Sequence, residues 1–236
     1  MFVDMHHHLI YGLDDGAQTY EDMKAMLLGA YQNGAEEIVT TPHVTPGREP
    51  FDGERYLSHF RAARQLCQDE NLSLILHTGC EILYTDDTVR LLESGDIPTM
   101  ADTGYVLVEF LPGDSYDRLK RAARALGNVG YQPIFAHVER YACLRKGSHL
   151  EELHEDYQVV MQVNASTFVK AGFFERRWLD RLVNRGFVDL VSSDAHNVDT
   201  RCFRMRECYD FLKKEYGEEM AQELCHDRAK RILTEQ

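Results

Sequence analysis

The sequence has no apolar run of the roughly 18 residues that a membrane-spanning helix needs. Its first residues, MFVDMHHHLIYG, carry neither a basic leader nor a long apolar stretch. We therefore expect a cytoplasmic protein without a transmembrane segment. The six cysteines form no CxxC pair, so neither a zinc ribbon nor a disulfide scaffold is indicated. The thiols are expected to be reduced and mainly to pack.

Positive charge is also scarce, because 26 Lys and Arg face 39 Asp and Glu and the net charge at pH 7 is −13. Nucleic-acid binding depends on clustered Lys and Arg. The chain has no basic stripe, and we expect no nucleic-acid partner. It also lacks internal repeats, low-complexity tracts and a Pro/Gly/Ser-rich linker, so residues 1–236 are expected to form a single domain.

Short β-branched runs recur along the chain and are separated by stretches with helical spacing. The expected strands cover residues 2–5, 37–41, 73–79, 105–110, 132–137, 159–164 and 188–193. Runs that are apolar throughout and alternate with helices indicate a parallel sheet covered by helices. Seven such units predict an α/β fold, a single-domain distorted (β/α)7 TIM-like barrel.

Two helices can be bounded from the sequence. Residues 19–33 begin at a capping Thr19 and are followed by Gly34, and residues 115–127 begin at Ser115 and are expected to end at Gly127. The segment 42–53 holds three of the six prolines and is expected to be an irregular loop. Loops of this kind often cover functional sites.

Side chains of the kind that bind metal ions follow nearly all of the expected strands. They are His6, His8, Asp15, His43, Glu81, Glu109, His137, Asp194 and His196. Parallel α/β barrels place their chemistry at the carboxyl ends of the strands. Because side chains alternate along a strand, His6 and His8 should face one side and His7 the other. A mixed imidazole and carboxylate set is suited to Mn, Fe or Zn.

Some of these residues also have explanations that do not involve a metal ion. Three adjacent histidines can be a remnant of a purification tag, but here they lie between a strand-like run and Leu9-Ile10. A lone histidine such as His43 or His137 is more often a hydrogen-bonded core residue than a ligand. Glu109 lies inside an apolar strand, where a carboxylate needs a cation or hydrogen-bond donors.

Four carboxylates are too many for one pocket without compensating positive charge. Two divalent ions would neutralise Asp15, Glu81, Glu109 and Asp194, and three would leave a positive cavity suited to an anionic substrate. The number of ligands therefore predicts more than one metal ion.

Taken together, the blocks D-x-H-x-H, DDG, TPH, G-x-E, VEF, H-x-ER and SDAHN resemble the polymerase-and-histidinol-phosphatase (PHP) family. The resemblance runs from Asp4 to about Tyr209. Within the family, the sequence resembles the bacterial manganese-dependent tyrosine phosphatases of capsule and exopolysaccharide operons. Tyr11 and Val138 stand where family members often have Pro, and neither change replaces a ligand.

The resemblance implies a PHP-type catalytic domain with three divalent ions, most simply Mn²⁺, with Fe or Zn as alternatives. It assigns His6, His8, Glu81 and Asp194 to one ion, Glu81, Glu109 and His137 to a second, and Asp15, His43 and His196 to a third. Glu81 would bridge two ions. Arg140 and Arg201 would bind the phosphate, although Arg201 could instead form an ion pair on an exposed helix. Arg48, in the divergent loop after His43, is a further candidate without family support.

The implied reaction is hydrolysis of a phosphomonoester by a metal-activated hydroxide. A phenolate, with a parent pKa of about 10, leaves more easily than an alkoxide. The implied substrate is a phosphotyrosine protein, with a bacterial tyrosine kinase of polysaccharide synthesis as the partner. Two alternatives stay open at this point: a small-molecule phosphatase of the histidinol-phosphatase type, and a metal-bound module that binds a kinase without catalysis.

A thiolate phosphatase is a further alternative, because Cys225 and Arg231 have the C-x5-R spacing. That chemistry uses a glycine-rich loop of backbone N–H groups around the phosphate. The segment has no glycine. It is predicted to be a helix with Leu224, Ala229, Ile232 and Leu233 on its apolar face.

Overall fold

The computed structural model describes residues 1–48 and 50–234, within which parallel strands alternate with helices. The strands are β1 (Phe2–His7), β2 (Ala35–Thr40), β3 (His43–Val44), β4 (Ile75–Thr78), β5 (Glu81–Leu83), β6 (Tyr105–Glu109), β7 (Gln132–Phe135), β8 (Val160–Asn164) and β9 (Leu190–Ser192). The α-helices are α1 (Tyr20–Gln32), α2 (Gly53–Asp69), α3 (Thr88–Glu93), α4 (Tyr116–Asn128), α5 (His149–Tyr157), α6 (Ala165–Lys170), α7 (Phe173–Asn184), α8 (Met205–Tyr216), α9 (Glu218–Gln222) and α10 (Arg228–Thr234). Short turns of other helix types are η1 (Met100–Asp102), η2 (Val138–Arg140), η3 (Ala142–Arg145) and the π-helical η4 (Glu223–Asp227).

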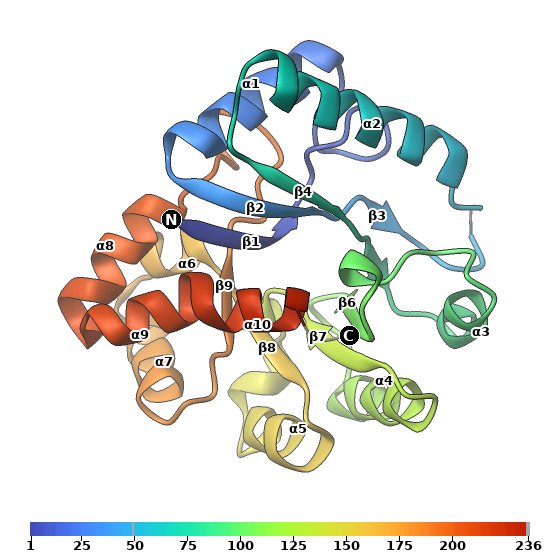
Figure 1. Cartoon of the computed structure of the whole chain (residues 1–236). Coiled ribbons are helices and arrows are strands. Elements are labelled where there is room, and N and C mark those ends of the chain that lie inside the picture. The colour runs from blue at the N-terminus through green and yellow to red at the C-terminus, as the bar shows by residue number, and fades with distance from the viewer. Residues whose placement is uncertain (49, 235–236) are drawn as a thin grey trace.

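The strands form two parallel sheets that are connected at their edges. One has the order β1-β2-β4 and the other β3-β5-β6-β7-β8-β9. A parallel bridge between His7 and Ala195 links β1 to the segment after β9, and Glu81 N donates to Pro42 O at 3.0 Å on the other side. Figure 1 shows the strands at the centre and the helices around them. This is the predicted α/β, TIM-like architecture.

Each of the seven expected strands is present, and two short strands were not predicted separately. β3 continues the course of β2 after Pro42, which has no N–H for the sheet ladder. β5 follows β4 after Gly79, where a Cβ would lie 2.7 Å from Val39 Cγ1. Glycine fits there because the backbone at residue 79 passes very close to the Val39 side chain of β2. The segment 42–53, expected to be an irregular loop, is irregular in its described residues apart from the two-residue strand β3 and the start of α2 at Gly53.

The two helices bounded from sequence are confirmed, with one correction. Thr19 accepts a hydrogen bond from Asp22 N and Asp22 returns one, which forms a capping box at the start of α1. Ser115 caps α4 in the predicted way. The expectation that Gly127 ends α4 was wrong, because the helix continues to Asn128. The left-handed residue after α4 is Gly130, with φ of +88°.

The C-terminal helix packs against the first strand. Val3 and Met5 of β1 belong to the same buried apolar cluster as Ala229 and Ile232 of α10. Figure 1 shows α10 lying across the strands, near the start of β1. In the described part of the chain, no helix is both long and apolar enough to span a bilayer.

Candidate metal centre

One buried carboxylate oxygen lies at the centre of the predicted ligands. Glu81 Oε2 is 3.0 Å from His6 Nε2, 3.2 Å from His8 Nε2 and 3.1 Å from His43 Nδ1. Glu81, His6 and His8 are essentially inaccessible to solvent. Within residues 1–48 and 50–234, Glu81 Oε2 has no partner with hydrogen-bond geometry. Nitrogen and oxygen lone pairs therefore converge on one point, as they do around metal ions.

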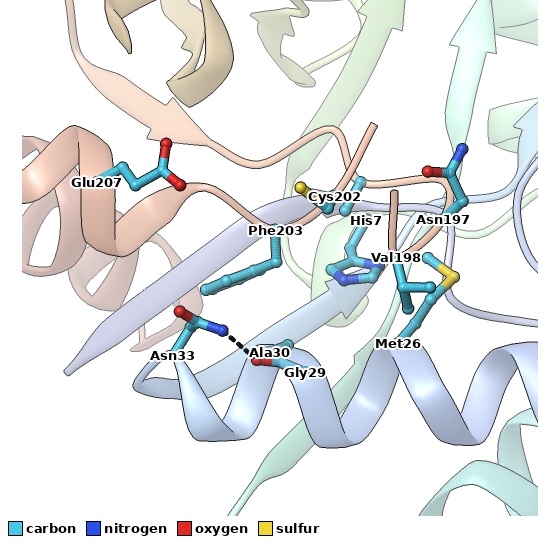
Figure 2. Close-up of a pocket in the computed structure, with 11 residues that line it drawn as sticks. His7, Met26, Gly29, Ala30, Asn33, Asn197, Val198, Cys202, Phe203 and Glu207 are labelled. Atoms are coloured by element: carbon cyan, nitrogen blue, oxygen red, sulfur yellow. Dashed lines mark hydrogen bonds between the residues drawn. The ribbon is translucent and has the colours of Figure 1, made fainter. Parts of the chain in front are cut away.

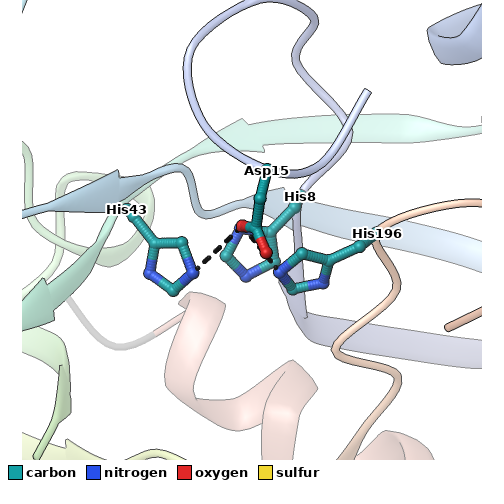
Figure 3. A group of neighbouring side chains, drawn as sticks. All are labelled: His8, Asp15, His43 and His196. Atoms are coloured by element: carbon teal, nitrogen blue, oxygen red, sulfur yellow. Dashed lines mark ion pairs between the residues drawn. The ribbon is translucent and has the colours of Figure 1, made fainter. Parts of the chain in front are cut away.

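The ligand atoms fall into three groups, and within each group all atoms lie within 4.8 Å of one another. The first contains His6, His8, Glu81 and Asp194, the second His8, Asp15, His43 and His196, and the third His43, Glu81 and Glu109. In the second group, the Asp15 carboxylate reaches between two imidazoles (Figure 3), at 3.4 Å from His43 Nε2 and 3.3 Å from His196 Nε2.

These groups differ from the expected ligand sets in two respects. His8 and His43 each belong to two groups, whereas the resemblance gave each of them one ion. His137 belongs to none of the three groups. Its Nε2 atom nevertheless lies 2.8 Å from Glu81 Oε1 and 3.7 Å from Glu109 Oε2. His137 is thus placed beside the two carboxylates with which it was expected to act.

The donor set fits divalent transition metals. His196 Nε2 is buried and, like Glu81 Oε2, has no hydrogen-bond partner in the described ranges. Buried polar atoms without partners are costly. Mixed imidazole and carboxylate ligands favour Mn, Fe or Zn over Mg or Ca, because Mg and Ca prefer ligand sets made of oxygen alone.

The titration behaviour of the group follows from its charges. Burial lowers the pKa of His8, but the carboxylates of Asp14 and Glu81 outweigh burial and raise it to about 10. Burial raises the pKa of Glu81, but the positive charge of His6 and the hydrogen bond from His137 hold it well below the usual value. Burial and the neighbouring His8 charge lower the pKa of His196 to about 3. A metal ion entering the first group therefore replaces protons.

Several residues that hold the ligands were missed by the sequence analysis. His8 Nδ1 donates to Asp14 Oδ2 at 2.7 Å, and His6 Nδ1 donates to Gln162 Oε1 at 3.2 Å. Asn164 Nδ2 donates to Asp194 Oδ2 at 2.7 Å. Such partners fix which imidazole nitrogen remains available for a metal. A signal was present in the sequence, because Gln162 and Asn164 are alternating polar residues in an otherwise apolar strand, β8.

Two of the predicted ligands have left-handed backbone conformations. His137 has φ of +34° and Asp194 has φ of +50°. Such conformations cost about 1–3 kcal/mol for a residue other than glycine and persist where surrounding contacts enforce them. His137 N donates to Gln162 Oε1 at 2.8 Å, and Asp194 N donates to His6 O at 2.9 Å. The backbone is therefore bent at the strand ends that present these ligands.

Both predicted phosphate-binding arginines reach the centre from its rim. Arg140 Nη2 is 2.6 Å from Asp194 Oδ2, and Arg201 contacts Asp15 Oδ2 at 3.1 Å and Asp194 Oδ1 at 3.3 Å. Their side chains are 41% and 37% exposed, so their remaining donors can meet a ligand from solvent. The alternative of a purely surface ion pair for Arg201 does not describe this geometry. Arg48 is exposed and lines a neighbouring pocket.

His7 faces away from the centre, as strand alternation predicts. Its ring points into a cavity of about 210 Å³ beside α1, lined by Met26, Val198 and Phe203 among others (Figure 2). Burial lowers its pKa to about 3, and neither ring nitrogen has a hydrogen-bond partner in the part of the chain that the structure describes. His6, His7 and His8 are all buried at the end of β1, whereas an appended tag would be exposed.

Comparisons with known proteins agree with this geometry. Residues 2–234 match the family model "Capsular polysaccharide synthesis, CpsB/CapC". The chain is 31% identical to tyrosine-protein phosphatase CpsB of Streptococcus pneumoniae, with 99% of each chain covered. It is 30% identical to tyrosine-protein phosphatase YwqE of Bacillus subtilis, with 92% of this chain and 86% of that protein covered.

Solved structures give the same picture. The chain superposes with a TM-score of 0.89 and 27% identity, covering 99% of this chain and 95% of the other, on a structure from a study of YwqE and CpsB, described there as unique metal-dependent tyrosine phosphatases. A zinc-bound histidinol phosphate phosphatase of Lactococcus lactis gives a TM-score of 0.60 at 16% identity, covering 97% of each chain. The second likeness supports the fold alone.

Proposed function

The chain belongs to the CpsB/CapC family of capsular polysaccharide synthesis, and from this premise we propose that it is a metal-dependent phosphatase that hydrolyses phosphotyrosine on a protein. The observation that carries the proposal is the convergence of His6, His8 and His43 on Glu81 Oε2, with Arg140 and Arg201 at the rim. This arrangement combines ligands for metal ions with donors for phosphate.

We assign the nine ligands to three Mn²⁺ ions. His6, His8, Glu81 and Asp194 would hold the first, Glu81, Glu109 and His137 the second, and Asp15, His43 and His196 the third. Proximity within the ligand groups supports the first and third sets, and the nearness of His137 to Glu81 and Glu109 supports the second. His8 and His43 each belong to two groups, so each could also serve a neighbouring ion. When bound, such ions lower the pKa of coordinated water and offset the charge of phosphoryl oxygens.

The chain's own residues orient the centre and the substrate. Asp14 accepts a hydrogen bond from His8 Nδ1, which leaves Nε2 directed at the centre, and Gln162 Oε1 accepts one from His6 Nδ1 with the same effect. Asn164 holds one oxygen of Asp194 and leaves Oδ1 toward the histidines. Arg140 and Arg201 can donate to phosphoryl oxygens, where charge-assisted hydrogen bonds stabilise the developing negative charge.

The partner we propose is a bacterial tyrosine kinase of polysaccharide synthesis, because the family acts in that process. We further propose that the protein acts in the cytoplasm, which the six free cysteines support. A single PHP-type catalytic domain over residues 1–236 is supported by the packing of Ile232 in α10 against Val3 in β1.

The test compares substrates on protein that has been stripped of metal and reconstituted with Mn²⁺. We expect phosphotyrosine peptides to be hydrolysed well, phosphoserine peptides poorly, and no activity after exhaustive chelation with metal content verified. Mn²⁺ should restore at least as much activity as Mg²⁺. A preference for histidinol phosphate would favour the small-molecule alternative. Full metal occupancy without turnover of any aryl phosphate would favour a kinase-binding module.

A further inference from the structure

A pocket of about 480 Å³ adjoins the metal centre on the side of the 42–53 segment. Its lining includes Asp14 and His43 together with Arg48, Phe51 and Arg55. His43 is also a member of two of the candidate metal groups, so the pocket and the centre share a wall. A substrate bound at the metals would place its neighbouring residues in or near this pocket.

We propose that this pocket, the Arg48–Arg55 pocket, binds an acidic side chain of the substrate protein close to the phosphotyrosine. The proposal rests on the proposed function and adds to it a preference for substrates with an acidic residue near the phosphotyrosine. Arg48 then recognises a carboxylate beside the reacting group, which differs from the third phosphate contact considered from sequence. Both arginines lie on the wall of this pocket, and their side chains have no partner within the described residues.

The segment that carries Arg48 is fixed against α3. Thr85 Oγ1 donates to Pro46 O at 3.0 Å. Gly47 has φ of +78°, a conformation that favours glycine, and it lies directly against the Asp87 carboxylate. Arg48 N closes the turn by donating to Thr45 O at 3.2 Å. The backbone leading into Arg48 is therefore held by contacts of Pro46 and Gly47 and by the turn from Thr45.

Arg55 is held against the loop between β1 and α1. Gly12 in that loop has φ of +67°, and a Cβ there would lie 2.9 Å from Arg55 Nη2. The guanidinium thus lies against the backbone of the loop that also carries Asp14 and Asp15. Arg55 projects from the first turn of α2, whose N-cap Asp52 accepts from Arg55 N at 3.0 Å.

Within the described residues, neither guanidinium is neutralised by a carboxylate. Across residues 1–48 and 50–234, the side chains of Arg48 and Arg55 form no ion pair or hydrogen bond, although the chain carries 39 acidic residues. The two carboxylates that line the pocket are otherwise engaged. Asp14 accepts from His8 Nδ1, and Asp52 caps α2. The pocket therefore presents two unpaired donors that match a carboxylate, beside the half-buried ring of Phe51.

The experiment measures kcat/KM of the Mn²⁺-loaded full chain on two phosphotyrosine peptides. One carries Asp next to the phosphotyrosine and the other carries Asn. We expect wild type to prefer the Asp peptide by roughly tenfold, the size expected for a charge-assisted contact. In Arg48→Gln/Arg55→Gln the ratio should fall close to one. All rates are divided by the rate of the same variant on p-nitrophenyl phosphate, which has no neighbouring side chain.

The matched control is Arg121→Gln/Arg124→Gln on α4. These arginines are also exposed, have no ion pair in the described ranges and lie outside the Arg48–Arg55 pocket. The control removes the same charge, so it should keep the preference of wild type. An equal loss of the preference for the Asp peptide in both double variants would show a general electrostatic effect and would overturn the proposed role of the pocket. A rate loss of similar size on both peptides and on p-nitrophenyl phosphate, with an unchanged Asp-to-Asn ratio, would make Arg48 a contact of the reacting phosphate instead.

Binding separates this proposal from the proposed function. Fluorescence anisotropy with unphosphorylated labelled peptides measures peptide binding at the pocket without turnover. If wild type hydrolyses no phosphotyrosine peptide, the proposed function fails, while tighter binding of the Asp peptide that depends on Arg48 and Arg55 still supports the pocket. Equal binding of the Asp and Asn peptides, or binding unaffected by Arg48→Gln/Arg55→Gln, overturns it.

Discussion

Arg140 Nη2 donates a hydrogen bond to Asp194 Oδ2 over 2.6 Å, so a proposed phosphate-binding residue touches a proposed metal ligand. The same oxygen accepts from Asn164 Nδ2, and Arg201 approaches the other oxygen at 3.3 Å. Asp194 is thereby held in one orientation, with Oδ1 3.4 Å from His6 Nε2. The proposed metal site and the proposed phosphate-binding arginines therefore share this one carboxylate.

Alanine at Arg140 or Arg201 should reduce catalytic efficiency on an aryl phosphate by roughly tenfold to a hundredfold. This is the loss expected for a charge-assisted contact of about 1.5–3 kcal/mol. Bound metal should be retained, because neither arginine is a ligand. Steady-state kinetics and metal analysis check both statements. Arg90→Ala on α3, which removes an exposed arginine paired with Asp87, should keep normal kinetics. Unchanged kinetics in both test variants would contradict the assignment.

Metal binding should release protons at neutral pH. The raised pKa of His8, about 10 in the metal-free protein, means that its imidazole is protonated at pH 7 and must lose that proton to become a ligand. The apparent affinity for Mn²⁺ should therefore increase as the pH rises toward 10 and decrease as it falls. Calorimetric titrations in buffers of different ionisation enthalpy measure the number of protons released. Identical heats in all buffers at pH 7 would contradict this account.

Asp14 should matter for metal affinity although it is not a proposed ligand. Asp14→Asn keeps the shape but removes the charge that fixes the His8 tautomer, so we expect roughly a tenfold to hundredfold weaker Mn²⁺ affinity. High Mn²⁺ concentrations should restore the turnover of this variant. Asp22→Asn, which alters only the cap of the exposed start of α1, is the control. Normal affinity in Asp14→Asn would show that the hydrogen bond to His8 has no effect on the site.

The contrast between Asp14 and Asp15 shows where sequence reasoning succeeds and where it ends. Strand alternation was enough to place His6 and His8 on one face and His7 on the other, because it depends on local geometry alone. The role of Asp14 depends on its distance from His8 across a loop, which no periodicity reveals. The sharing of His43 between two groups likewise depends on the short strand β3, whose pairing with β5 is a long-range contact.

The same limit applies to element boundaries. The capping signals at Thr19 and Ser115 act within four residues and were sufficient to place the starts of α1 and α4. The end of α4 was misplaced, because a glycine inside a helix is tolerated when its neighbours pack well. Leu126, directly before Gly127, is fully buried, and the left-handed turn comes at Gly130.

His6 and His7 offer a test with adjacent residues. His6→Ala removes a nitrogen from the first ligand group, so metal content and turnover should fall together. His7→Leu should keep both, because the His7 ring faces the cavity beside α1 and has no hydrogen-bond partner in the described ranges. Replacing a buried, unpaired polar group by an apolar one is often neutral or stabilising. Metal loss in folded His7→Leu equal to that in His6→Ala would refute the alternation of these side chains.

The last prediction separates metal chemistry from thiolate chemistry by comparing Cys225→Ser with Glu81→Ala. Cys225 is fully buried in the π-helical turn η4, within the large apolar cluster that also contains Cys208 and Leu212. It lies in a helical segment without glycine, so no loop of N–H groups surrounds it for phosphate binding. Serine at this position should lower the free energy of unfolding modestly and leave turnover near that of wild type.

Glu81→Ala should have the opposite effect, because this carboxylate lies within 3.2 Å of four imidazole nitrogens and is proposed to bridge two ions. Metal occupancy and rate should fall together while the protein remains folded. A thiolate mechanism predicts the reverse order, since serine is a far weaker nucleophile at neutral pH. Both variants are assayed with saturating Mn²⁺, with metal content measured and folding followed by circular dichroism. An inactive Cys225→Ser protein that is folded and fully metallated would overturn the metal mechanism, because no metal ligand would have been changed.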